Sequence, residues 1–198
     1  MPRILLTAFE PYDVWSENSS WLTLVELTHW LDFSDQVVTR RYPVDLSEMA
    51  HRLEGDLTHG FDYAVHLGQS PGSPAIKLET TGLNSTDQGT RLVASGPAAY
   101  RTTLPLQRWE AKLRGEGIPA LVSHHAGTYL CNAALYLSQH FAEERALPTR
   151  SFFIHLPLAP QQVSERLGSN PPLASMSLQM MAYAISLVLT DLLTTLET

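Results

Sequence analysis

Cysteine is nearly missing from this chain, since Cys131 is the only one among 198 residues. A single thiol excludes an intrachain disulfide framework and fits a reducing compartment. Basic residues are also scarce, with 13 Lys and Arg against 20 Asp and Glu and a net charge of −7. Because no Lys/Arg cluster interrupts this acidic balance, binding to nucleic acid or to anionic membranes is not expected.

Long hydrophobic runs are lacking as well. The apolar run in MPRILLTAFEPYD is too short for the core of a signal peptide, and no small-residue cleavage site follows it. The most apolar region, 176–196, is interrupted by Ser, Gln, Thr and Asp, which indicates a core or interface helix and not a membrane span. The expected location of the protein is therefore the cytoplasm.

Several motifs that bind metals and cofactors do not occur. HExxH, HxH and CxxC spacings are absent from the sequence, so a metal site is not expected. GxxxxGK[ST] and GxGxxG are absent too, which removes the usual cradles for phosphates and dinucleotides.

Apolar runs and helical patterns alternate along the chain. Strands are expected at 4–9, 36–44, 61–68, 119–125 and 150–158, while 75–84 fits a strand or an extended loop. Helices are expected at 19–31, 46–57, 104–117, 129–147 and 175–196. This alternation predicts a single-domain α/β/α sandwich over 1–198, with a twisted, mostly parallel central sheet flanked by helices.

The loops that follow strands are the expected place for a site. In open α/β sheets, ligands bind beyond the carboxyl ends of the strands. Four such loops come after Phe9, Gly68, His125 and Leu156. Functional side chains are therefore sought beside these four positions.

Cys131 lies just after the third of these loops, in the first turn of an expected helix. Unpaired N–H groups at a helix start stabilise a thiolate. The small residues Ala126, Gly127 and Thr128 would let a substrate carbonyl approach those amides, as an oxyanion site requires. The alternative, a buried cysteine that packs as a small hydrophobe, is the commoner state of this residue type.

A nucleophilic cysteine needs a base, and the base needs an acceptor that orients it. His155 ends an expected strand in FFIHLPL, although a histidine in an apolar run is more often a core residue. Glu79 is an isolated carboxylate that an imidazolium would suit if it is buried, and otherwise a solvent-facing neighbour of Lys77. His66 fits a core position, whereas solvated positions are expected for four others: His29, His51, His59 and His140.

Three segments taken together resemble the pyroglutamyl-peptidase I family of cysteine peptidases. They are LLTAFEPYD with NSSW after it, LGQSPGSPAIKLETTGLN, and GIPALVSHHAGTYLCNAALY with FFIHLPLAPQQ downstream. The segment GPAAYRTTLP at 96–105 also resembles the family, so that the likeness covers nearly the whole chain. It implies Cys131 as nucleophile, His155 as base and Glu79 as the group that orients the imidazole.

The resemblance also implies a substrate and a pocket. The family removes an N-terminal pyroglutamyl residue from peptides by acyl transfer through a thioester, with no cofactor. Its pocket for the lactam ring is implied here at six positions: Phe9, Tyr12, Asn18, Gln69, Tyr129 and Leu130. Taken alone, Phe9 and Tyr129 would be core aromatics and Asn18 a helix cap. Members often associate, so a homo-oligomer is implied, and the stripe of Met180, Ala184, Leu187 and Leu192 fits either core packing or such a contact.

The sequence departs from the family after Glu79. An Arg that usually follows this Glu is replaced by Thr80, and the next loop is shortened to STDQGTRLVAS. The role of that Arg is therefore either vacant or taken by Arg91. Two alternatives to a pyroglutamyl peptidase therefore stand. One is a related cysteine hydrolase acting on another small acyl amide, and the other is a non-catalytic binding protein on the same scaffold.

Overall fold

A computed structural model describes residues 1–29, 36–166, 168 and 172–194. Its first half contains β1 (Ile4–Phe9), α1 (Ser19–Leu27), β2 (Val37–Tyr42), α2 (Leu46–Leu57), β3 (Tyr63–Gln69), β4 (Ile76–Glu79), β5 (Thr81–Leu83) and β6 (Ala99–Arg101). The second half contains α3 (Leu106–Gly115), β7 (Ala120–Ser123), α4 (Leu130–Glu144), β8 (Arg150–Leu156), α5 (Pro160–Ser164) and α6 (Leu178–Thr194).

Six strands form the central sheet in the order β2-β1-β3-β8-β4-β7. Neighbouring strands are parallel except for β4 and β8, which are antiparallel. The expectation of a mostly parallel sheet flanked by helices is confirmed, and the structure adds that β4 and β7 run against the other four strands.

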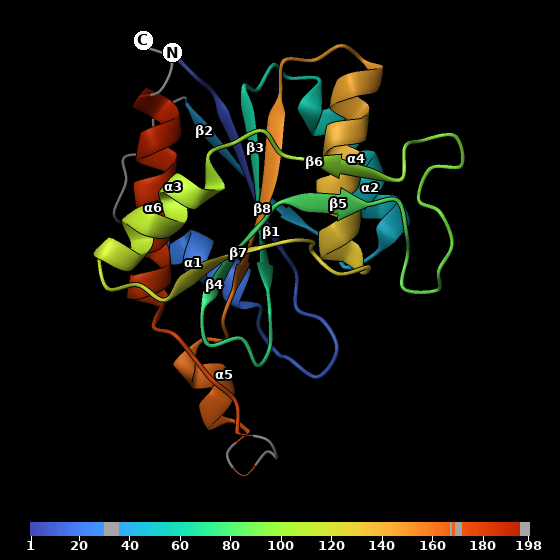
Figure 1. Cartoon of the computed structure of the whole chain (residues 1–198). Helices are drawn as coiled ribbons and strands as arrows, with labels where there is room; N and C mark the ends of the chain where they lie inside the picture. The colour runs from blue at the N-terminus through green and yellow to red at the C-terminus, as the bar shows by residue number, and fades with distance from the viewer. Residues whose placement is uncertain (30–35, 167, 169–171, 195–198) are drawn as a thin grey trace.

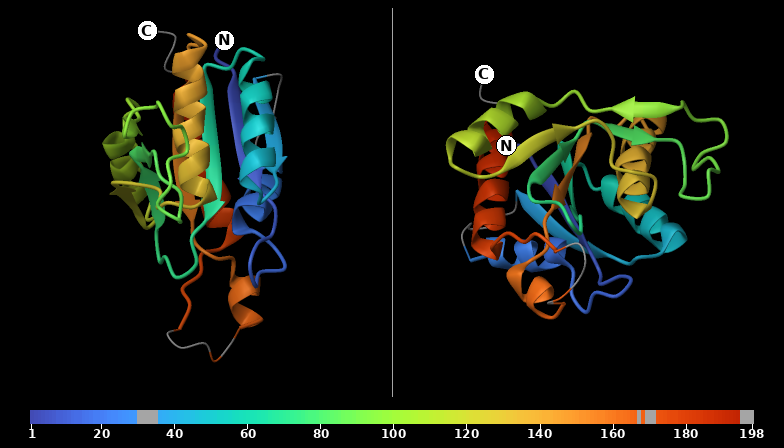
Figure 2. Two further views of the ribbon diagram at one scale, coloured as in Figure 1. Left: turned by 90° about the vertical axis from the view of Figure 1, so that its right-hand side faces the viewer. Right: turned by 60° about the horizontal axis from the view of Figure 1, so that its bottom comes forward.

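Each face of the sheet is covered by helices (Figure 1). One hydrophobic core combines alternate residues of the strands, such as Leu6 and Ile154, with α1, α3 and α6. The second core takes the intervening residues, such as Leu5 and Phe153, together with α2 and α4. Because both faces are buried, the inner strands β1, β3 and β8 are nearly continuous buried runs. The left view of Figure 2 shows α2 and α4 side by side over their face.

The region 75–84, which fitted either a strand or a loop, holds two short strands in different sheets. β4 joins the central sheet, and β5 pairs with β6 in a separate antiparallel sheet that packs on α4. A Cβ on Gly82 would lie 2.7 Å from the backbone nitrogen of Tyr136, so only glycine lets β5 approach α4 this closely.

Asn132 of α4 ties the same strand down. Its side-chain oxygen accepts the N–H of Leu83 at 2.7 Å, and its nitrogen donates to the carbonyls of Leu83 and Ser85, both at 2.9 Å. The strand that follows Glu79 is thus attached to the residue next to Cys131.

Element boundaries differ from the expected ones by a few residues, and two short elements were missed. The expected helix at 46–57 agrees with α2, while those at 104–117 and 129–147 are shorter as α3 and α4. The missed elements are β6 and α5, which have three and five residues. Parts of two expected helices, 30–31 and 195–196, lie outside the described residues.

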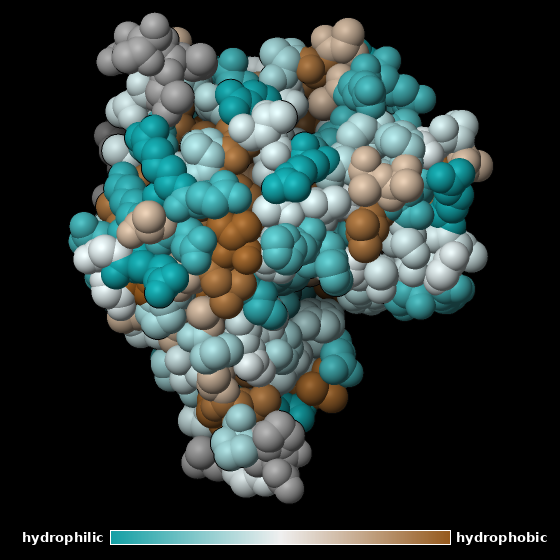
Figure 3. Space-filling view, in the orientation of Figure 1, coloured by the Kyte–Doolittle hydropathy of each residue, from teal (hydrophilic) through white to brown (hydrophobic). Residues whose placement is uncertain are grey.

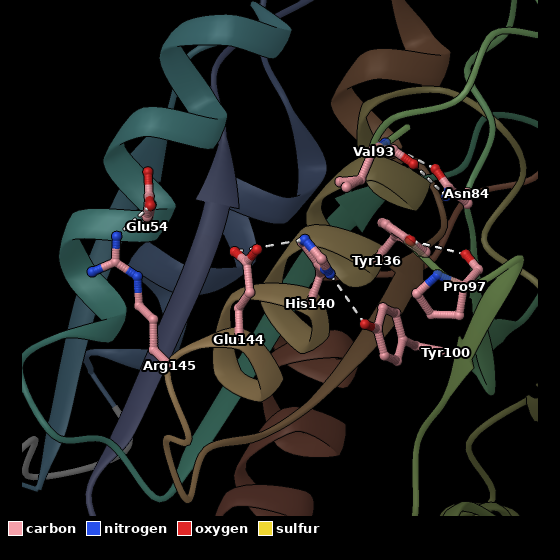
Figure 4. Close-up of polar contacts among 9 residues, drawn as sticks. All are labelled: Glu54, Asn84, Val93, Pro97, Tyr100, Tyr136, His140, Glu144 and Arg145. Carbon is pink, nitrogen blue, oxygen red and sulfur yellow. Dashed lines mark hydrogen bonds and ion pairs between the residues drawn. The ribbon is translucent and has the colours of Figure 1, made fainter. Parts of the chain in front are cut away.

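One expected surface histidine is buried. His140 was expected to be solvated, but it is 8% exposed, and its Nδ1 is 3.1 Å from the hydroxyl of Tyr100. Figure 4 shows it between Tyr100 of β6 and Glu144 of α4, while the Tyr136 hydroxyl donates to the Pro97 carbonyl nearby. The helical pattern could not reveal this, because the second sheet covers this side of α4.

Two other expectations about burial are resolved. His66 is a core histidine as expected, and burial lowers its pKa to about 3, so the ring is neutral. The stripe on α6 is divided, with Ala184 and Leu192 in the core and Met180 39% exposed. In the described ranges, none of the helices has the length and hydrophobicity that crossing a bilayer requires.

Candidate active site

Cys131 lies in the first turn of α4, next to Gly68 near the carboxyl end of β3 and His155 near that of β8. The chain reaches this helix through a turn at Gly127, whose φ of 81° is a left-handed conformation that favours glycine. Tyr129 is the N-cap residue, and its side chain makes no capping hydrogen bond. The first-turn N–H groups, which an α-helix cannot pair internally, are therefore not capped by that side chain.

His155 and Glu79 face each other across the antiparallel pair of β4 and β8. Lys77 is opposite His155 and Glu79 is opposite Phe153, so Glu79 is the diagonal neighbour of His155 on the same face. The distance from His155 Nδ1 to Glu79 Oε1 is 2.7 Å. Glu79 is 1% exposed, which rules out the solvent-facing alternative.

The surroundings of His155 favour its charged form. Burial by itself lowers the pKa of the ring, because an imidazolium is poorly solvated in the protein interior. The charge of Cys131 and its hydrogen bond to the ring act in the opposite direction, as do the hydrogen bond and charge of Glu79. The contacts with Cys131 and Glu79 outweigh burial and raise the pKa of His155 from 6.5 to about 9.

Gly68 of β3 makes room for the thiol. It is paired with His155 in the parallel register and therefore points to the same face. A Cβ at this position would lie 2.5 Å from the Phe153 ring and 2.9 Å from the sulfur of Cys131. Any larger residue would push the sulfur of Cys131 away from its place.

A small cavity of about 40 Å³ opens beside the sulfur of Cys131. Its walls contain Val44 and all six residues that the resemblance implied: Phe9, Tyr12, Asn18, Gln69, Tyr129 and Leu130. We call this cavity the acyl pocket. It lies near the loop after β1, which is drawn in blue below the sheet in Figure 1.

The aromatic walls of the acyl pocket differ in burial. Phe9 is 3% exposed and its ring packs on Tyr42 and Phe153, so it is also a core residue. Tyr129 is 50% exposed and forms the rim, contrary to its reading as a core aromatic. Burial and the charge of Cys131 raise the pKa of Tyr12 to about 12, so its hydroxyl keeps its proton at neutral pH.

Two hydrogen bonds to its side-chain oxygen hold Gln69 in one orientation. Gln69 Oε1 accepts the N–H of Ser19 at 2.8 Å and the Nε2 group of Gln162 at 2.7 Å. Gln162 is 3% exposed, and its Nε2 also donates to the carbonyl of Glu17. Gln69 Nε2 is buried and faces the Tyr12 hydroxyl, and their contact lowers the pKa of Tyr12 against the larger effect of burial.

Asn18 caps α1 and closes the loop after β1. Its oxygen accepts the N–H of Ser20 at 3.0 Å, and its nitrogen donates to the carbonyl of Glu10 at 2.9 Å. The side chain thus has the role of a helix cap that its position suggested, and it also lines the acyl pocket.

Arg91 does not take the place of the missing Arg near Glu79. Its guanidinium donates to the carbonyls of Ala94 and Gly96 in its own loop, and it does not line the acyl pocket. Sequence reasoning also missed Gly68, Asn132 and Gln162 as parts of the site. Gly68 and Asn132 stand next to the singled-out Gln69 and Cys131, but no local pattern indicates the contacts they make.

Among the residues that the structure describes, no group of three or more His, Cys, Asp and Glu side chains is arranged to hold a metal ion.

Comparison with known proteins gives one consistent answer. The chain matches the pyroglutamyl peptidase family over residues 2–193. It is 33% identical to a pyrrolidone-carboxylate peptidase of Pyrococcus furiosus, covering 96% of this chain and 100% of the relative, and 36% identical to one of Pseudomonas fluorescens, covering 93% and 90%. A crystal structure of a pyrrolidone carboxyl peptidase from Fervidobacterium islandicum matches with a TM-score of 0.91 and 31% identity, covering 97% of this chain and 98% of that one. The chain therefore belongs to the pyroglutamyl peptidase family of cysteine peptidases.

Proposed function

We propose that this protein hydrolyses the amide bond after an N-terminal pyroglutamyl residue of peptides, with Cys131 as nucleophile, His155 as general base and acid, and Glu79 as the group that orients His155. The observation that carries the proposal is the chain of contacts from Glu79 through His155 to Cys131, at the start of a helix and at the mouth of a small pocket. An activated cysteine nucleophile requires a base and a third group that orients the base, and His155 and Glu79 are in position for these two roles.

The reaction begins with transfer of the thiol proton of Cys131 to His155. With its pKa raised to about 9, His155 is a strong enough base to accept this proton. The thiolate attacks the pyroglutamyl carbonyl, and N–H groups in the first turn of α4 stabilise the oxyanion. His155 protonates the leaving amine as the tetrahedral intermediate collapses to a thioester. Water, deprotonated by His155, then hydrolyses the thioester and frees Cys131.

The acyl pocket suits an uncharged five-membered lactam. Phe9 and Leu130 offer apolar surfaces for the flat ring, and Tyr129 lies at the rim. The buried Nε2 group of Gln69 lies near the Tyr12 hydroxyl, and a lactam carbonyl beside it would supply a further acceptor. A ligand that supplies this acceptor is favoured over one that does not, because buried N–H groups are stabilised by hydrogen bonds.

The experiment is cleavage of an L-pyroglutamyl fluorogenic amide by the wild type and by Cys131→Ala. We expect release of the fluorophore by the wild type and a fall of at least about 10³-fold in kcat for the variant, because loss of the nucleophile removes the covalent route. An L-prolyl amide serves as the control substrate, since its ring has no lactam carbonyl and its nitrogen is charged.

The outcomes separate the alternatives. A folded wild type that cleaves neither substrate, but whose Cys131 reacts readily with iodoacetamide, would contradict pyroglutamyl specificity and support a related hydrolase with another acyl amide. A Cys131 that is unreactive in the folded wild type would leave only the non-catalytic binding protein. Equal cleavage by Cys131→Ala would remove this residue from the mechanism.

A further inference from the structure

A second, larger cavity adjoins the acyl pocket. It has a volume of about 410 Å³, within the range of about 300–1,000 Å³ that is typical of small-ligand sites. It lies between the start of α2, the loop 86–92 and the start of α4, and we call it the outer cleft. Val44, Tyr129 and Leu130 line both cavities, so the two share a wall.

The position of the outer cleft fits the part of the substrate that leaves. In the proposed reaction the pyroglutamyl ring fills the acyl pocket and its carbonyl is attacked by Cys131. The rest of the peptide must continue from that carbonyl outwards, past the half-exposed Tyr129. In Figure 3 the outline of the molecule is indented below the lobe that contains α2, α4, β5 and β6 in Figure 1.

The charges in the walls of the outer cleft are all of one sign. Asp45 and Asp87 line it, and its lining includes no Lys or Arg. Neither carboxylate forms an ion pair within the described part of the chain. Arg91 is close in sequence to Asp87, but its guanidinium donates to the carbonyls of Ala94 and Gly96.

The two carboxylates are not equivalent. Asp45 is the N-cap of α2, and one of its oxygens accepts the N–H of Glu48 at 2.8 Å. The partial positive charge of the helix start offsets some of its field. Asp87 is on the shortened loop, has no such helix behind it, and is exposed. It is therefore the stronger attractor for a cation.

We propose that the outer cleft binds the leaving peptide and that Asp45 and Asp87 give the enzyme a preference for Lys or Arg directly after the pyroglutamyl residue. This inference rests on the proposed function. The ion pairs would be partly exposed, and solvent weakens pairs of that kind, so a modest preference is expected. We expect kcat/KM to fall about threefold from Lys to Gln at this position and about threefold again from Gln to Glu, with a smaller range at high salt.

The test is a competition among three peptides, pyroglutamyl-X-Leu-amide with X as Lys, Gln or Glu, in one reaction at low ionic strength. Product ratios, measured by chromatography, give the ratios of kcat/KM directly. The variants are Asp87→Asn and the double change with Asp45→Asn, since Asn keeps the helix cap. Glu110→Gln is the matched control, because it removes a carboxylate from α3 on the other side of the sheet.

We expect the order Lys, Gln, Glu in the wild type and in Glu110→Gln, and nearly equal rates for the three peptides in the double variant. Equal rates in the wild type, or a preference that survives the double change, would overturn the inference but leave the proposed function in place. A preference for Glu would also overturn it, and would indicate a path beside Lys77, which pairs with His155 across the strands. Failure to cleave any of the three would overturn the proposed function itself.

Discussion

At the scale of single residues, the proton on His155 links the site to pH. The pKa of His155 is raised to about 9, so the imidazolium, which protonates the leaving amine in the proposed mechanism, is lost as the pH rises through that value. We predict that kcat/KM falls on a basic limb near pH 9. In Glu79→Gln the carboxylate charge is removed, which lowers the pKa of His155 and moves the limb to lower pH. The profile of kcat/KM against pH for both proteins is the measurement.

The same shift affects stability. Because the pKa of the folded state, about 9, is above the ordinary value of 6.5, the interaction of His155 with its partners contributes fully to stability below about pH 6.5. The contribution decreases as the pH rises through about 9.

A basic limb of kcat/KM that stays at the same pH in Glu79→Gln would contradict the role given to this carboxylate.

Gly68 is the residue at which the smallest change should have the largest effect. In Gly68→Ala the new methyl group would overlap the Phe153 ring and the sulfur of Cys131. A displacement of about 1 Å in a catalytic group costs about 10²-fold in rate, so we predict a loss of kcat of roughly that size. The measurement is kcat on a pyroglutamyl amide, with circular dichroism to check the fold.

Gly55→Ala is the control for this change. Gly55 is an exposed helical residue of α2, and a Cβ there has no atom within 4 Å. Alanine should leave kcat unchanged and stabilise the helix by about 0.5–1 kcal/mol. Equal activity of Gly68→Ala and Gly55→Ala would mean that the sulfur has more room than its contacts indicate.

The sequence could predict the types of the site residues but not their contacts. Cys131, His155 and Glu79 each had an ordinary structural explanation, and only the resemblance brought them together. Their roles stay predictions until the variants are measured. Gly68 and Gln162 could not be assigned, because their partners are distant in sequence and meet them only in the folded chain.

At the scale of elements, α5 supports the acyl pocket through one side chain. Gln162 binds Gln69 Oε1 and so fixes which end of the Gln69 amide can face the substrate. We predict that Gln162→Leu raises KM for a pyroglutamyl amide by about tenfold with a smaller effect on kcat, because a hydrogen bond that holds a buried amide is worth about 1 kcal/mol or more. The rate of alkylation of Cys131 by iodoacetamide should not change.

The neighbouring Gln161→Leu is the matched control for that experiment. Gln161 is exposed and its side chain has no partner in the described ranges, so KM should stay as in the wild type. If both variants behave alike, or if Gln162→Leu slows alkylation of Cys131 as much as it slows cleavage, Gln162 acts on the fold as a whole and not on Gln69.

Long, strongly patterned elements were predictable, and short ones were not. Helix α2 has an apolar face of Met49, Leu53 and Leu57, and its bounds agree with the expected ones. Strand β6 has three residues with partly or fully exposed side chains, which produces no apolar alternation. It exists because β5 offers it a pairing edge, and that is a tertiary property.

At the scale of the whole molecule, composition and the alternation of strand and helix patterns were enough to predict the fold class, but not the order of the strands. Apolar alternation indicates which face of a strand is buried, but it carries no information on the direction in which the neighbouring strand runs. The reversal of β4 against β8 was therefore invisible in the sequence. Expectations about the number of domains, the compartment and a homo-oligomer remain predictions.

The pairing of β4 with β8 restricts where residues can be inserted or deleted as sequences of this kind change over time. Successive residues of a strand point to opposite faces, so inserting or deleting one residue within β4 would turn the Glu79 carboxylate towards α3 and α6, away from His155. The loop 84–98 has no such parity to keep, because Asn84 holds it from its base through Val93 and Gly96. Length variation in descendants of this chain should therefore accumulate in that loop, while the four residues of β4 stay free of gaps.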